Sequence, residues 1–92
     1  MNVTSAVFDN LFQVSIDTID HPIAFVPDSH HPEYGGQVCY GPLMRRYHWM
    51  IDGRIVFEFF DVISHDVQVS AVREFIKHTK EQAPQWSDHM FR

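Results

Sequence analysis

Seven histidines and one cysteine are the residues of this chain best suited to hold a transition metal. The adjacent His30 and His31, with Cys39 and His48, could supply imidazole and thiolate ligands. A structural zinc site usually draws four ligands from close pairs, and the chain has no C-x-x-C, H-x-H or H-E-x-x-H spacing. Adjacent histidines on an extended chain also point to opposite sides. The sequence therefore favours solvated loop histidines, and it predicts neither a metal nor a cofactor.

Ser64, His65 and Asp66 carry the three side-chain types of a hydrolytic triad. Sequence neighbours seldom form one, because the three groups must converge from different directions. No G-x-S-x-G motif or phosphate-binding glycine loop accompanies them. A better explanation is that Asp66 is the N-cap residue at the start of a helix. The sequence therefore predicts no enzyme.

Charge is distributed very unevenly along the chain. All seven Lys and Arg residues follow position 44, whereas five acids precede it: Asp9, Asp17, Asp20, Asp28 and Glu33. The formal charge of −5 therefore belongs to the first 44 residues. Pairs such as Asp17 and Asp20 could perform acid–base chemistry, but solvated loop carboxylates need no such role. Two interpretations stay open: a negative field that docks on a basic groove, or an acidic surface that maintains solubility.

The run Arg45-Arg46-Tyr47-His48-Trp49 is the second candidate for partner binding. Strand alternation would place Arg45, Tyr47 and Trp49 on one face and the other two residues on the opposite face. Tyr, Trp and Arg are enriched at interface hot spots. The alternative is that Tyr47 and Trp49 belong to the core, with Arg45 at its rim.

The bulk composition limits the class of protein. Ninety-two residues with 45% hydrophobic side chains predict a single domain covering residues 1–92, with a thin core. A lone cysteine permits no intramolecular disulfide, and no long apolar run or signal sequence is visible. We expect a soluble cytoplasmic protein. Its negative charge argues against binding free DNA.

The first half of the chain predicts few regular elements. Residues 4–16 carry an apolar stripe of helical spacing, although residues 13–16 also alternate like a strand. Residues 23–26 predict a strand near a sheet edge, because prolines flank them. Residues 27–37, with two prolines and a Gly pair, predict a loop.

The second half predicts a long hairpin and a helix. Strand-like residues 43–51 and 54–63 flank Asp52-Gly53, which favours a two-residue turn. That turn would set Trp49 opposite Val56 and Tyr47 opposite Glu58. Both hairpin faces are apolar, so either each is covered by a helix or one is a binding surface. An amphipathic helix is predicted over 67–82, ended by Pro84, and residues 83–92 are expected to form a loose tail. The expected fold is α+β, with a mainly antiparallel three- or four-stranded sheet and packed helices.

The chain also resembles the phage-encoded anti-CRISPR proteins. The resemblance is carried by the opening Met-Asn-Val-Thr-Ser-Ala-Val-Phe-Asp-Asn and by Arg-Arg-Tyr-His-Trp-Met-Ile-Asp-Gly-Arg, which ends at Arg54. It implies a small inhibitor of a type I-F CRISPR surveillance complex. Such a protein binds subunits of the Cas7, Cas5 or Cas8 type, or the guide-RNA backbone. It then either blocks target-DNA binding or blocks recruitment of the nuclease.

The first hypothesis is therefore a non-enzymatic inhibitor of a type I CRISPR–Cas complex. The second is a small phage or bacterial regulatory or structural protein that homodimerises through its hairpin, and the third is a small metal-dependent enzyme. For the first hypothesis, the candidate partner-binding residues are Arg45, Arg46, Tyr47, Trp49, Arg54, Asp17, Asp20, Asp28 and Glu33.

Overall fold

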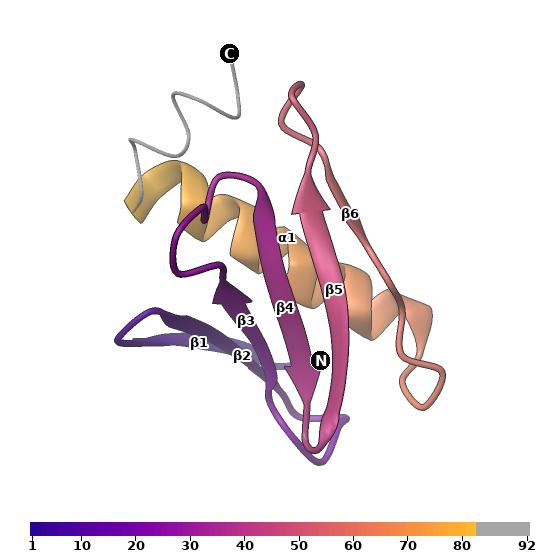
Figure 1. The fold of residues 1–92 in the computed structure, drawn as a ribbon. Helices are drawn as coiled ribbons and strands as arrows, with labels where there is room; N and C mark the ends of the chain where they lie inside the picture. The colour runs from indigo at the N-terminus through magenta and orange to yellow at the C-terminus, as the bar shows by residue number, and fades with distance from the viewer. Residues whose placement is uncertain (83–92) are drawn as a thin grey trace.

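Within residues 1–82, six antiparallel strands follow one another across a single sheet in chain order (Figure 1). The computed structural model describes residues 1–82. The strands are β1 (Val3–Phe8), β2 (Leu11–Ile16), β3 (Ile23–Pro27), β4 (Gly35–Tyr40), β5 (Leu43–Trp49) and β6 (Ile55–Phe57), followed by the helix α1 (His65–Gln82). The helix crosses one face of the sheet (Figure 1). The α+β class is confirmed, but the sheet has six strands instead of three or four, and one helix among residues 1–82 replaces the expected packed helices.

The helical expectation for residues 4–16 is wrong, because this segment forms the hairpin of β1 and β2. Phe8 pairs with Leu11, and the turn between them is made by Asp9 and Asn10. Asp9 adopts a φ of 53°, in the left-handed region that Asp tolerates better than most residues. The buried set Phe12, Val14 and Ile16 has a period of two, so burial against α1 selects the strand.

β3 lies in the middle of the sheet and not near an edge, since it pairs with both β2 and β4. Its prolines cause no conflict, because Pro22 precedes the strand and Pro27 is its last residue. The predicted loop 27–37 extends too far, because β4 already begins at Gly35.

The Gly35–Gly36 pair belongs to a strand and is required by close backbone approach. A Cβ on Gly36 would lie 2.2 Å from the Val26 carbonyl oxygen, and one on Gly35 would lie 2.3 Å from the Tyr47 carbonyl oxygen. Gly35 also has a φ of 151°, which other residues rarely adopt. These glycines therefore let β4 lie close to both neighbouring strands.

The hairpin of β5 and β6 exists, but its register differs by one residue from the prediction. Trp49 faces Ile55 and Tyr47 faces Phe57. The connection is longer than two residues, because the Met50 amide donates to the Arg54 carbonyl and the Gly53 amide donates to the Met50 carbonyl. A one-residue shift exchanges the faces of all side chains in β6. Ile55 and Phe57 consequently join the face of β5 that packs on the core.

Helix α1 begins two residues before the predicted start. Ser64 caps it, since its Oγ accepts a hydrogen bond from the Val67 amide at 3.4 Å, so Asp66 is a first-turn acid and not the N-cap. The buried carboxamide of Gln68 bonds to the amide and carbonyl of Phe60, at 2.6 and 2.8 Å, and to the carbonyl of Ile63 at 2.9 Å. These bonds attach the segment after β6 to the helix. The predicted stop at Pro84 and the predicted tail 83–92 lie outside the described residues.

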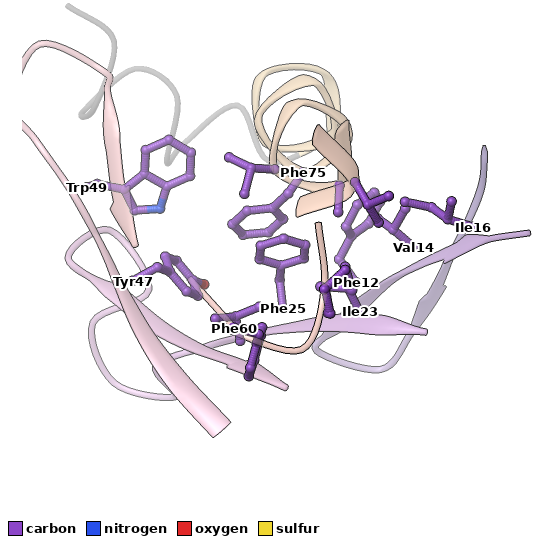
Figure 2. Packing of buried hydrophobic residues seen from close by; sticks show 14 residues of the cluster. Phe12, Val14, Ile16, Ile23, Phe25, Tyr47, Trp49, Phe60 and Phe75 are labelled. Atoms are coloured by element: carbon purple, nitrogen blue, oxygen red, sulfur yellow. The ribbon is translucent and has the colours of Figure 1, made fainter. Parts of the chain in front are cut away.

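The core lies between α1 and one face of the sheet (Figure 2). Phe75 of the helix stands at its centre and stacks on Phe25 of β3, with ring centroids 4.4 Å apart. Phe12, Tyr47 and Trp49 surround this pair, with centroids 5.3 to 5.8 Å from the Phe75 ring. One aromatic cluster therefore connects β2, β3 and β5 to the helix.

Candidate functional site

The five acids of the first 44 residues do not form one surface. Asp9 lies in the β1–β2 turn, Asp17 and Asp20 lie in the β2–β3 connection, and Asp28 and Glu33 lie in the β3–β4 loop. Strands alternate in direction, so the β2–β3 connection is at the opposite end of the sheet from the other two. The twist of the sheet further separates the β1–β2 turn from the β3–β4 loop (Figure 1). The negative charge is therefore presented at three places.

The β3–β4 loop is organised by the side chain of Asp28. One carboxylate oxygen of Asp28 accepts hydrogen bonds from the amides of His30 and His31, both at 2.9 Å. The hydrogen bond from the His31 amide, and to a smaller extent that from the His30 amide, lowers the pKa of Asp28 below its usual range. The Asp28 amide donates to the Gly35 carbonyl at 2.9 Å, and His31 lies 3.3 Å from a Glu33 oxygen. The loop thus holds an ionised carboxylate in a fixed position.

Beside this loop is an open hollow of about 730 Å³. Three of the predicted site residues line it: Asp28 from the loop and Arg46 from β5, which are both exposed, and the buried Tyr47 of β5. Gly35 and Gly36, which have no side chains, also line it. The remaining lining residues are Val26, Pro27, Ser29, His31, Tyr34, Gln37 and His48. A hollow with a carboxylate, a guanidinium and imidazoles suits polar recognition of a partner.

The three predicted arginines are in three different environments. Arg45 lies on the helix-covered side, where its guanidinium is 5.5 Å from the centre of the Phe60 ring and donates to the Met44 carbonyl. Arg46 is exposed on the opposite face of the sheet. Arg54 lies in the β5–β6 connection, and its Nε is 2.7 Å from an Asp52 oxygen. The structure therefore does not bring them together, and Arg46 is the one that lines the hollow.

Tyr47 and Trp49 are core residues, with only 2% and 7% of their surface exposed. The alternative raised by the sequence, that these rings pack inside, describes their position in this structure. The Tyr47 hydroxyl is buried and has no hydrogen-bond partner among residues 1–82. Burial, followed by the nearby Asp28 charge, raises the pKa of Tyr47 above its usual range, so the phenol stays neutral. Neither ring is accessible to a partner in this structure.

The face of the sheet opposite α1 is not covered by any element within residues 1–82. Alternation places Met44, Arg46 and His48 of β5 there, as the sequence predicts, and all three are exposed. Ala24, Gln37, Cys39 and Val56 share this face through their cross-strand pairing. Among the described residues, one face of the hairpin is covered by α1 and the other is open, so the expectation that a helix covers each face is not met there. The two-stranded pattern alone could not identify which face α1 would cover.

The residues that the sequence suggests for catalysis or metal binding either have structural roles or lie too far from one another to form a site. Ser64 caps α1, and His65 stacks on Phe59 with centroids 4.2 Å apart. Within residues 1–82, no three His, Cys, Asp or Glu side chains are grouped closely enough to hold a metal ion. In the same part of the chain, no helix has the length and hydrophobicity needed to cross a membrane.

Comparisons with family models, with curated proteins and with solved structures find no match to this chain. The relationship to anti-CRISPR proteins therefore stays a prediction from the sequence.

Proposed function

We propose that this protein is a non-enzymatic inhibitor that docks on a cationic, nucleic-acid-handling assembly. The candidate assembly is a type I CRISPR–Cas surveillance complex, which the sequence resemblance implies. On this proposal, the protein occupies a Lys- and Arg-lined groove of an effector subunit and prevents target DNA from binding there. It requires no cofactor.

The observation that supports this proposal most is the set of uncompensated exposed carboxylates. Asp9, Asp17, Asp20 and Asp28 are exposed, and none of them forms a salt bridge with Lys or Arg within residues 1–82. Their charges are therefore available to a partner. Complementary charge of this kind mainly increases the association rate, because it steers diffusional encounter.

The hollow beside the β3–β4 loop supplies the most specific contact of the proposed interface. Its Asp28 carboxylate is fixed by two backbone amides, so little conformational entropy is lost when a partner guanidinium binds there. Arg46, on the same hollow, would pair with an acidic side chain or with a guide-RNA phosphate. Arg45, Tyr47 and Trp49 then act indirectly, because they hold β5 in place.

A matched pair of charge variants tests the proposal. The first variant carries Asp17→Asn, Asp20→Asn, Asp28→Asn and Glu33→Gln. The control carries Glu58→Gln, Asp61→Asn, Glu74→Gln and Glu81→Gln, so both variants change the formal charge from −5 to −1. The readout is target-DNA binding by a purified type I-F complex. We expect the first variant to lose inhibition at low concentration and the control to retain it. Equal inhibition by both variants would exclude the specific acidic contact.

The alternative function is a small regulatory or structural protein that dimerises through the hairpin of β5 and β6. In the structure, β6 offers an edge of only three residues, Ile55–Phe57, which limits pairing at that side of the sheet.

A further inference from the structure

The opposite edge of the sheet, strand β1, lacks, within residues 1–82, the features that normally protect an edge strand. In the described part of the chain, its six residues, Val3 to Phe8, pair only with β2. They include no charged side chain and no proline, and five of the six are exposed. Natural sheets usually protect such an edge with charges, prolines, bulges or a covering element. Val7 and Phe8, which are 55% and 57% exposed, add apolar surface at this edge.

The outward-facing backbone groups of β1 can be identified from its pairing with β2. The Asn2 carbonyl accepts a hydrogen bond from the Asp17 amide, so Asn2 directs its backbone groups towards β2. Because these groups alternate along an antiparallel strand, Val3, Ser5 and Val7 direct theirs away from the sheet. Three N–H and three C=O groups are therefore available at this edge.

We propose that two copies of this chain associate through β1, in antiparallel pairing about a two-fold axis at Ser5. Ser5 then faces Ser5 of the second copy, Val3 faces Val7, and Thr4 faces Ala6. A two-fold axis perpendicular to the sheet places facing residues on the same face, so their numbers must add to an even value. Among such registers, this one pairs all six outward groups of each copy. The two six-stranded sheets become one continuous sheet of twelve strands.

The chemistry of the edge favours a second copy of this chain over a foreign strand. The chain carries a charge of −5, yet residues 1–8 contain no acid, so the two paired strands set no carboxylates opposite each other. In the proposed register, Asp9 falls opposite residue 1 of the second copy and not opposite another acid. Val3 and Val7 form β-branched cross-strand pairs on the side where α1 lies. The edge strand is therefore complementary to itself in hydrogen bonding and free of like-charge repulsion.

Charges introduced at Ser5 test both the interface and its register. Ser5 is exposed, so the monomer tolerates Lys or Glu there, which circular dichroism checks. In the dimer, two lysines or two glutamates would face each other at the axis and weaken association by roughly tenfold or more. The control Gln37→Lys adds the same charge at an exposed position of β4, on the open face.

Light scattering on the full chain at micromolar concentration gives the result. We expect dimers for the wild type and for Gln37→Lys, monomers for Ser5→Lys and Ser5→Glu alone, and dimers again when these two variants are mixed. A monomeric wild type overturns the proposal. Unchanged dimers of both Ser5 variants would show that association uses another surface. A mixture that stays monomeric would exclude the two-fold axis at Ser5.

Discussion

Phe25 of the central strand β3 and Phe75 of α1 lie face to face, with ring centroids 4.4 Å apart and ring planes 7° from parallel. Both side chains are fully buried, and this contact joins the sheet to the helix at the middle of the core (Figure 2). Phe75 also contacts the rings of Phe12, Tyr47 and Trp49. Because the core is thin and Phe75 is its central ring, we expect the stability of the fold to depend strongly on this side chain.

The Phe75→Ala substitution tests this dependence. Removing the ring leaves a cavity that the surrounding aromatic residues cannot fill, so we expect a loss of about 3–5 kcal/mol in the free energy of unfolding. Urea denaturation measures it. The control Phe59→Ala removes a ring that is 38% exposed, and it should cost much less. Equal losses in the two variants would contradict the central role of Phe75.

Gly36→Ala tests the close approach of β3 and β4. The added methyl group would lie 2.2 Å from the Val26 carbonyl oxygen and 2.9 Å from the Tyr47 hydroxyl, so the strands must separate. We expect a loss of about 1–3 kcal/mol or more in the free energy of unfolding. Gln37→Ala, at the exposed neighbouring position, should change stability little. A fully stable Gly36→Ala protein would show that the strand spacing is not tight.

Gln68→Leu tests how the segment after β6 is attached to the helix. Leucine has a similar volume but leaves the amide and carbonyl of Phe60 and the carbonyl of Ile63 without their bonds to the Gln68 side chain. Each buried group that loses its partner costs about 1–3 kcal/mol. Hydrogen exchange should show earlier loss of protection at the Phe60 amide than at amides of β3. Unchanged protection at Phe60 would contradict the attachment.

The stability of the protein should depend on pH through His78. This ring stacks on Phe12 with centroids 4.4 Å apart, and burial lowers its pKa below the usual 6.5, while Glu81 opposes that shift. The unfolded chain therefore binds a proton first as the pH falls, so stability decreases below about pH 6.5 and is unaffected above it.

Denaturation at pH 7.5 and at pH 5.5 measures this dependence. We expect the decrease to be smaller in His78→Phe, which keeps a stacked ring but cannot titrate, and unchanged in the exposed control His21→Gln. Asp28 and Asp52 affect the pH dependence of stability only below this interval, because backbone hydrogen bonds lower their pKa values from 3.8. An identical slope in wild type and His78→Phe would exclude His78 as the source.

Elements whose pattern was unambiguous could be predicted from the sequence. The helix over 65–82 was predicted to within two residues, because its apolar period and charged face leave one interpretation. Strand β5 and its two faces followed from simple alternation. In contrast, Val7, Phe8, Leu11 and Phe12 fit a helical stripe as well as two strands. Only the turn at Asp9 and packing against α1 distinguish these alternatives.

The remaining errors depend on contacts between distant residues. Gly35 and Gly36 look like a turn until Val26 and Tyr47 lie against them, so β4 was missed. The register of β5 and β6 depends on how the chain closes between Met50 and Arg54. For the candidate site, alternation separates Arg45 from Arg46 correctly. Which face of β5 is covered by α1 depends on the arrangement of the whole sheet, so the burial of Tyr47 and Trp49 could not be predicted from this strand alone.

The most direct test of the proposed function is a titration of the wild-type protein into a purified type I-F surveillance complex carrying its guide RNA. Isothermal calorimetry at about 50 and 200 mM salt measures both the stoichiometry and the electrostatic contribution. The proposal predicts saturable binding at a fixed ratio, with affinity that falls as salt increases. Absence of binding at the lower salt concentration would contradict it.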